Sequence, residues 1–330
     1  LSACGPDEPV TLRLMTHDSF DISAETMARF TEETNIAVDI FKAGDAGAMV
    51  NMAALASDDP LADVMFGVDN TFLSRALNNE IFISYESPVL GQINDELKLD
   101  PQNRAIPVDF GDVCLNYDRK WFTTNSLEPP QSLDDLVDPA YAGLTVVENP
   151  ATSSPGLAFL LATVDTYGEE GYLDYWQQLV ENEVLVTDGW EDAYYGAFTA
   201  ASDGDRPIVV SYASSPPAEV YFAETALELA PTAAVVSDGS CFRQVEFVGV
   251  LQGTEHEEEA QLLVDFLLSR QFQEDIPLHM FVFPANEKAE LPPVFLEHSQ
   301  IPQNPATIPP DEIAANREAW IQAWTETVLR

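Results

Sequence analysis

Several short segments carry residue types that suit the binding of a small molecule. Thr16-His17-Asp18-Ser19-Phe20 follows a predicted strand and offers an imidazole, a carboxylate and a hydroxyl. Asp69-Asn70 follows another predicted strand, where a carboxylate can accept hydrogen bonds from an amino group or face a cation. Both segments have a second interpretation, because Asp18 and Ser19 can be local turn groups and Asp69 can cap the next helix. The sequence leaves both interpretations open.

The segment Thr152-Ser153-Ser154-Pro155-Gly156-Leu157 is the most specific local signal in the chain. Hydroxyls followed by proline in the first turn of a helix expose free backbone N–H groups at its positive end, which stabilises an anion or a phosphate. A helix cap explains a serine and the proline, but it does not explain why three hydroxyl residues are adjacent. We therefore expect Ser153 and Ser154 to contact a ligand.

Aromatic residues stand where a buried core residue is not expected, at Gly189-Trp190 and at the strand end Tyr212. Aromatic faces hold a flat heterocycle or a cation by stacking and cation–π attraction, worth ~0.5 to 2 kcal/mol each. The pair Tyr194-Tyr195 could bind ferric iron as tyrosinates. Adjacent residues of a helix point to different faces, however, so a packing function is the more common one.

These segments need a scaffold, and the chain alternates predicted strands with predicted helices. Alternation of this kind indicates a mostly parallel sheet with helices on its faces. A break at Ile106 to Gly111 separates two such α/β runs, and the chain crosses back at about 244–248. The predicted strands are 10–15, 36–40, 63–67, 113–117, 144–148, 207–212 and 244–251, and the predicted helices are 23–30, 44–56, 70–77, 156–167, 170–181, 257–268 and 310–329.

Two lobes follow from this order, and 330 residues suit two domains of roughly 150 residues each. Ligands of open α/β sheets bind beyond the carboxyl ends of the strands, so we expect a cleft lined by the loops after each strand. In the last helix, Trp320 and Trp324 lie on one apolar stripe and are expected to pack rather than to bind. The expected boundaries are 1–9 for a tether, 10–108 plus 246–286 for lobe 1, 109–245 for lobe 2, and 287–330 for a Pro-rich linker and a helix on the lobes.

The charge of the chain is extreme, with 56 Asp and Glu against 14 Lys and Arg and a formal net charge of -42. Such a field repels phosphate backbones and anionic membranes, which excludes nucleic-acid binding. It also favours a cationic ligand. Adaptation of the surface to a salty medium is the simpler explanation for most of this charge. A hydrophobic content of 46% still indicates a folded protein rather than a disordered one.

The three cysteines have two different predicted functions. Leu1-Ser2-Ala3-Cys4 is typical of the end of a bacterial lipoprotein signal, which predicts an extracytoplasmic protein tethered by a lipid on Cys4. Cys114 and Cys241 then remain as an even pair in an oxidising compartment, and a disulfide is the simplest hypothesis. No CxxC or HExxH motif occurs and the four histidines lack ligand spacing, so we expect neither a metal site nor a cofactor.

Nearly the whole chain resembles the thiamine-binding substrate-binding proteins of bacterial ABC importers. The resemblance implies a two-lobe type II periplasmic-binding-protein fold that closes on thiamine or its phosphates, without catalysis. The segments that carry it include 16–20, 62–70, 108–111, 130–136, 152–157, Gly189-Trp190, 210–216, 244–246, 272–284 and 317–321.

The resemblance also implies functions for individual residues. Trp190 and Tyr212 would be aromatic walls, Asp69 and Asp109 would meet the aminopyrimidine or the thiazolium charge, and Ser153-Ser154 would face the hydroxyethyl or phosphate end. Two positions depart from the family, which often has tyrosine at His17 and tryptophan near Phe281. One stacking surface is therefore altered, and the preference among thiamine forms could differ.

The expected partners are thiamine or its phosphates and the permease and ATPase subunits of an importer. The chain is expected to be a monomer that meets the membrane only through the lipid. Two alternatives stay open. One is another cargo, either ferric iron held by Tyr194-Tyr195 and His17 or a polyamine. The other is a thiaminase-like enzyme with Cys114 as nucleophile and Glu246 as base, which a Cys114–Cys241 disulfide would silence.

Overall fold

The computed structural model describes residues 10–44, 46–56 and 59–330, which divide into two units. Unit 1 runs up to Phe110 and includes Val245–Leu291, and unit 2 consists of Gly111–Gln244 and Pro292–Arg330. Sequence reasoning places the crossings at 108/109 and 245/246 and treats 287–330 separately, whereas the structure assigns the chain from Pro292 onward to unit 2. The tether and Cys4 lie outside the described residues.

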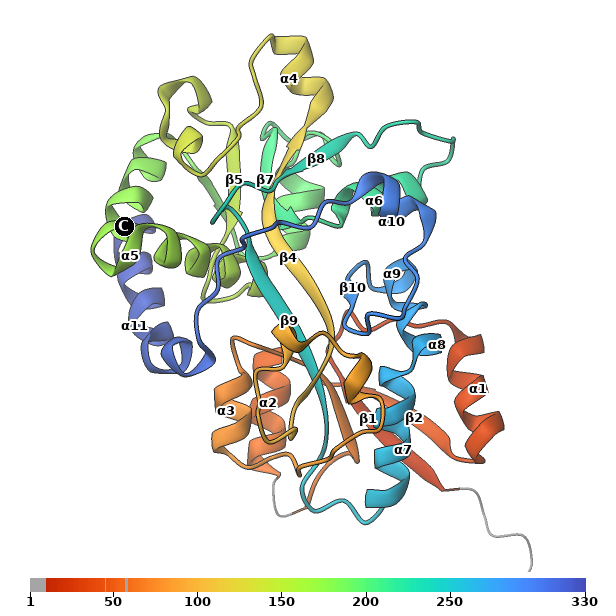
Figure 1. Ribbon diagram of the computed structural model, residues 1–330. Coiled ribbons are helices and arrows are strands. Elements are labelled where there is room, and N and C mark those ends of the chain that lie inside the picture. The colour runs from red at the N-terminus through yellow and green to blue at the C-terminus, as the bar shows by residue number, and fades with distance from the viewer. Residues whose placement is uncertain (1–9, 45, 57–58) are drawn as a thin grey trace, which may run out of the picture. The chain divides into compact units, whose positions relative to one another are not determined.

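Unit 1 is an α/β unit whose strands β2, β1 and β3 are parallel, with β9 antiparallel to β3 (Figure 1). The short strand β10 pairs with the start of β4 at Phe110. The strands are β1 Thr11–Thr16, β2 Ala37–Lys42, β3 Val64–Asp69, β9 Phe242–Val250 and β10 Phe283–Pro284. The helices are α1 Ala24–Thr34, α2 Ala46–Leu55, α3 Leu73–Asn78, α7 Glu257–Leu268, α8 Arg270–Gln273 and α9 Ile276–His279, with 3-10 turns η1 Leu90–Gln92 and η2 Asp95–Leu97.

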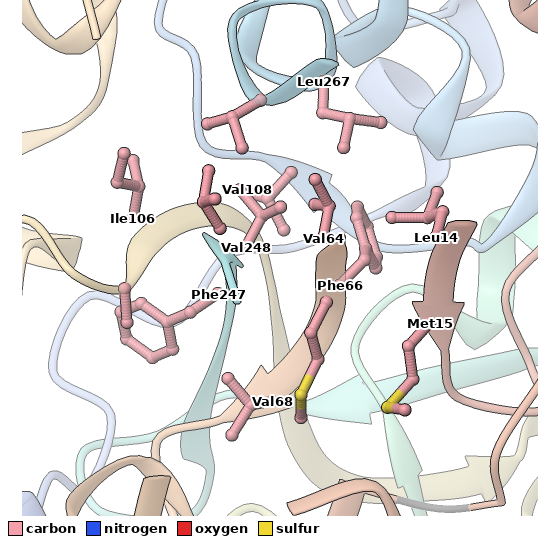
Figure 2. Close-up of a cluster of buried hydrophobic side chains, with 14 of the residues drawn as sticks. Leu14, Met15, Val64, Phe66, Val68, Ile106, Val108, Phe247, Val248 and Leu267 are labelled. Carbon is pink, nitrogen blue, oxygen red and sulfur yellow. The ribbon is translucent and has the colours of Figure 1, made fainter. Parts of the chain in front are cut away.

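The core of unit 1 lies around β3, which is buried along its whole length because neighbouring strands and helices cover both of its faces. Figure 2 shows side chains of β1, β3, β4 and β9 meeting Leu267 of α7 in this core. Helix α7 begins at Glu257 and ends at Leu268, as predicted, with three glutamates in its first turn that suit the positive end of the helix. This packing holds the carboxyl ends of β1 and β3 in fixed positions.

Unit 2 repeats the α/β pattern, with β5 parallel to both β6 and β7, while β7 and β8 are antiparallel to β4. The strands are β4 Ile106–Asp118, β5 Thr145–Glu148, β6 Leu185–Thr187, β7 Ile208–Tyr212 and β8 Thr232–Val235. The helices are α4 Arg119–Asn125, α5 Ser154–Glu181, α6 Ser215–Tyr221, α10 Pro293–His298 and α11 Pro310–Val328, with 3-10 turns η3 Asp134–Val137 and η4 Pro139–Tyr141 and the π-helical segment η5 Asp192–Ala197.

Helices α5 and α11 pack together in unit 2 (Figure 1). The Trp176 and Trp324 rings meet edge to face at 5.4 Å, and Trp320 is buried beside them, which confirms the predicted packing function of the last helix. Helix α5 covers both predicted helices 156–167 and 170–181, which are separated by non-helical backbone at Gly168. The Pro-rich segment is not only a linker, because α10 forms within it.

A disulfide joins Cys114 of β4 to Cys241, the residue before β9, within unit 2. Both cysteines are fully buried. Within the described part of the chain, no helix combines the length and the apolar character that crossing a membrane requires.

Candidate functional site

A glycine in β3 makes room for the imidazole of His17. The pairing of β3 with β9 shifts register between Phe66 and Val68, so Gly67 is an extra residue in the ladder, with a φ of 95°. His17 follows β1 directly beside this bulge, because Thr16 pairs with Phe66. A Cβ atom on Gly67 would lie 2.1 Å from His17 Cδ2. The imidazole therefore occupies the space that a side chain at position 67 would fill.

We expect Gly67→Ala to lower the free energy of unfolding by about 2 to 4 kcal/mol, because alanine is strained at positive φ and its methyl group displaces the imidazole. Urea unfolding measures the loss. Gly91→Ala is the matched control, since no atom lies within 4 Å of its Cβ position and its φ is not positive. Equal effects of the two substitutions would contradict the proposed close fit.

Glu246 links the titratable groups of unit 1. It pairs in register with Asp69 across β9 and β3, which brings the two carboxyl groups to one edge of the sheet. His17 Nε2 lies 3.1 Å from Glu246 Oε2. Burial lowers the pKa of His17, but the charge and hydrogen bond of Glu246, together with Asp69, outweigh burial and raise it above 6.5. An imidazole and two carboxyl groups therefore form one coupled cluster, which we call the Glu246 cluster.

Asp69 is part of this cluster and also part of a turn. Its Oδ1 accepts hydrogen bonds from the Thr71 backbone N–H at 2.7 Å and from the Thr71 hydroxyl at 2.5 Å. The local capping interpretation is therefore correct for this oxygen. Burial raises the pKa of Asp69 to about 6, and the charge of Glu246 adds to the increase, while the Thr71 hydrogen bonds oppose it. A carboxyl group with this pKa exchanges its proton near neutral pH.

Asp109 of β4 completes the acidic set of unit 1. It is fully buried, and neither of its carboxyl oxygens has a hydrogen-bond partner among the described residues. Burial, reinforced by the charge of Glu246, raises the pKa of Asp109 well above 3.8. A buried polar group without a partner costs free energy, roughly 1 to 3 kcal/mol. His17, Asp69, Asp109 and Glu246 together suit a ligand that is rich in N–H donors or positively charged.

Two other predicted residues of unit 1 have different surroundings. Asp18 is exposed, and its Oδ1 accepts a hydrogen bond from the Gly44 N–H at 3.2 Å, so its structural function is in a turn. Phe281 is half-buried after α9 and has a φ of 54°, a conformation that bulky residues rarely adopt. A ligand-binding function for Asp18 and Phe281 stays a prediction.

In unit 2 the hydroxyl segment has internal partners. Ser153 is the N-cap of α5, and its Oγ accepts a hydrogen bond from the Gly156 N–H at 3.3 Å. The Thr152 hydroxyl donates to the Asp188 carbonyl at 2.6 Å. The helix-cap interpretation is therefore correct for Ser153, whereas the bond of Thr152 to Asp188 could not be predicted from the sequence. Ser154, the first residue of α5, is half-buried, and its ligand-binding function stays a prediction.

Trp190 is the best-fixed aromatic candidate of unit 2. Its Nε1–H donates to Ser211 Oγ at 2.9 Å, and its ring stacks on Tyr194 with centroids 4.9 Å apart. The indole is only partly buried. Tyr212 donates a hydrogen bond to Gln244 Oε1 at 3.2 Å. Both rings are thus held in place by the unit before any ligand arrives.

The tyrosine pair does not have the properties of an iron site. Tyr194 is buried and Tyr195 is 60% exposed, which confirms that the two side chains point differently. The Tyr194 hydroxyl donates to Glu219, and burial together with that carboxylate raises the pKa of Tyr194, which opposes the tyrosinate form. Across the described residues, no group of three or more His, Cys, Asp or Glu is arranged to hold a metal ion. Cys114 is bonded to Cys241 and so has no thiolate to act as a nucleophile.

Known proteins are similar to this chain in sequence and in fold. Residues 59–315 match the model of the family described as bacterial extracellular solute-binding protein. This chain belongs to that family. The "Thiamine-binding periplasmic protein" of Escherichia coli (strain K12) is 30% identical over 97% of this chain and 94% of its own length. That of Salmonella typhimurium (strain LT2) is 29% identical over 97% of this chain and 94% of its own length.

A solved structure, "Periplasmic thiamin binding protein", superposes with a TM-score of 0.80 at 27% identity and covers 100% of both chains. The fold is therefore the α/β fold of the type II periplasmic binding proteins, which confirms the predicted fold class and the predicted family. The family is one of binding proteins rather than of catalysts, and it acts outside the cytoplasm.

Two residues of unit 1 were not predicted as ligand-binding residues. Glu246 is named from the sequence as a candidate base and within a segment of the family resemblance but not as a ligand-binding residue, yet it pairs with Asp69 and with His17. The sequence signal for Glu246 is a charged residue within the mostly apolar stretch 244–251. The sequence predicts a regular strand over 63–67, although a glycine inside a strand often marks a bulge.

Proposed function

We propose that this chain is an extracytoplasmic receptor that binds thiamine, or its mono- or diphosphate, and delivers it to an ABC permease driven by an ATPase. The observation that carries the proposal is the full-length similarity to the thiamine-binding relative of Escherichia coli. The chemistry of each unit is consistent with it. In this proposal the chain works as a monomer, and a lipid on Cys4 holds it at the membrane.

Unit 1 supplies acceptors for the aminopyrimidine. The ring carries an amino group and ring nitrogens, so it needs both acceptors and donors. Asp69 and Glu246 are acceptors at one edge of the sheet. Burial raises the pKa of Asp109, which favours the protonated form that supplies both an O–H donor and an acceptor. The positive charge of the thiazolium is favoured by the same carboxyl groups.

Unit 2 supplies aromatic surface and hydroxyls. Trp190 and Tyr212 would contact the flat rings, and Ser153 and Ser154 at the start of α5 would face the hydroxyethyl or phosphate end. Binding leaves thiamine intact in this proposal, because Cys114, the nucleophile that a thiaminase-like reaction would need, is held in a disulfide.

Native mass spectrometry of the purified chain with an equimolar mixture of thiamine, its two phosphates, spermidine and ferric citrate tests the class of ligand. The proposal predicts one bound thiamine form per chain. A complex with spermidine or iron in place of any thiamine form would overturn it.

We expect Trp190→Ala to weaken thiamine binding about tenfold, because it removes one stacking and cation–π surface worth roughly 0.5 to 2 kcal/mol. Trp121→Ala is the matched control, since Trp121 is also half-buried in unit 2 but packs edge to face on Phe122 of α4. Calorimetric titration measures both. An unchanged affinity in Trp190→Ala would show that this indole is not a ligand wall.

A further inference from the structure

One buried glutamate of unit 2 is explained neither by the packing of the fold nor by the ligand contacts proposed above. Glu148 is the last residue of β5 and is fully buried. Neither of its carboxyl oxygens has a hydrogen-bond partner among the described residues. An apolar side chain would avoid the cost of burying an unpaired carboxyl group. Its presence at the carboxyl end of a strand, where α/β proteins bind ligands, requires a different explanation.

The pairing of β5 with β7 shows on which face of the sheet the Glu148 side chain lies. Val146 of β5 pairs with Val209 of β7, and both pack in one cluster with Tyr194 and Trp190. Side chains alternate along a strand, so Glu148 and Ser211, two residues further along each strand, project from this same face. Ser211 Oγ accepts the hydrogen bond from Trp190 Nε1. The carboxyl group of Glu148 is therefore on the face of the sheet that carries the Trp190 indole.

We propose that Glu148 is the buried counter-charge for a cationic ligand held on the Trp190 indole, and that it loses a proton when the cation binds. The inference rests on the proposed function, with the thiazolium ring of thiamine as the cation. A positive charge on the indole and a carboxylate on the same face of the sheet attract each other through protein of low polarity. A neutral heterocycle would gain nothing from this arrangement, so Glu148 selects for positive charge.

The surroundings of Glu148 support a proton that leaves only when a cation arrives. Burial raises the pKa of Glu148 well above 4.5, and no neighbouring charge contributes to that shift. Helix α5, β6, β7 and η5 pack against β5. Strand β6 has no titratable residue, and α5 and Tyr212 of β7 pack in the cluster of Val147 on the opposite face. On η5, Asp192 and Tyr195 are exposed and Tyr194 donates to Glu219. The raised pKa of Glu148 therefore favours the neutral acid when no cation is bound.

Calorimetric titration of the full chain with thiamine at pH 7.5, in two buffers of different ionisation enthalpy, counts the protons released on binding. Glu148→Gln keeps the shape of the neutral acid but has no proton to lose. We expect this variant to bind thiamine about tenfold more weakly, which corresponds to a change of about one unit in the pKa of Glu148 when the cation binds. We also expect it to release fewer protons than the wild type.

Glu219→Gln is the matched control, because Glu219 is another buried carboxyl group of unit 2, but its oxygens accept hydrogen bonds from Tyr194 and Thr232. It should release as many protons as the wild type. A lower affinity of Glu148→Gln with unchanged proton release would indicate a merely structural function and overturn the inference, as would no change at all. If Glu148→Gln has a lower melting temperature than the wild type, Glu148→Met replaces it, because methionine also has no proton to lose. The same loss of affinity and of proton release is expected. Failure of the wild type to bind thiamine would instead overturn the proposed function.

Discussion

Replacing Cys114 and Cys241 together by alanine is expected to lower the free energy of unfolding by about 4 kcal/mol. The disulfide links residues 127 positions apart in sequence, so it removes a large part of the conformational freedom of the unfolded chain. In the chain-entropy account, closing a loop of about 100 residues contributes roughly 4.7 kcal/mol, and measured losses are about 2 to 5 kcal/mol. Guanidinium unfolding of the oxidised protein and the double variant measures the difference.

The wild type unfolded in the presence of a reductant is the control for this substitution. Its midpoint should approach that of the double variant, because both lack the cross-link, while the variant itself should not respond to reductant. A double variant that unfolds at the midpoint of the oxidised wild type would contradict a stabilising function for this bond. Reductant-insensitive unfolding of the wild type would lead to the same conclusion.

Asp69→Asn is expected to stabilise the fold at pH 7.5 by about 3 kcal/mol and to weaken thiamine binding by tenfold or more. The pKa of Asp69 is about 6 in the folded state, compared with about 4 for an ordinary aspartate. The folded state therefore holds the proton more tightly, so stability is lost as the pH rises from about 4 to about 6 and the full loss persists above pH 6. Asparagine removes this loss and keeps an oxygen for Thr71.

The pH dependence separates this explanation from a general packing effect. Urea unfolding of Asp69→Asn and the wild type should give similar stabilities at pH 4 and diverge by pH 7.5. Asp203→Asn, at an exposed position in unit 2, should follow the wild type at both pH values. A gain in stability that is equal at pH 4 and pH 7.5 would show that the ionisation of Asp69 is not its cause.

Much of the fold was predictable because the signals for it are local. The apolar periodicity and the acidic first turn of 257–268 predicted α7 with both of its ends. The tryptophan stripe of the last helix predicted its packing, and Trp324 meets Trp176 as expected. These predictions depend only on which side chains share one face of a helix, and that information lies within about 20 consecutive residues.

The site was less predictable because its residues come together through sheet register. His17 reaches Glu246, 229 positions away, only because a bulge at Gly67 leaves space for the ring. The pairing of Asp69 with Glu246 cannot be read from composition or spacing. Glu148 ends a predicted strand, and only the register with β7 shows that it lies on the sheet face that carries Trp190. Hydrogen-bond partners such as Asp188 for Thr152 depend on the same long-range pairing.

The central claim is that this chain binds thiamine reversibly and leaves it intact. Calorimetric titration of the oxidised wild type with thiamine, followed by mass analysis of the recovered ligand, tests it most directly. The account predicts saturable binding of one thiamine per chain and unchanged ligand at the end of the experiment. The absence of binding to thiamine and to both of its phosphates, or recovery of cleaved thiamine, would contradict it.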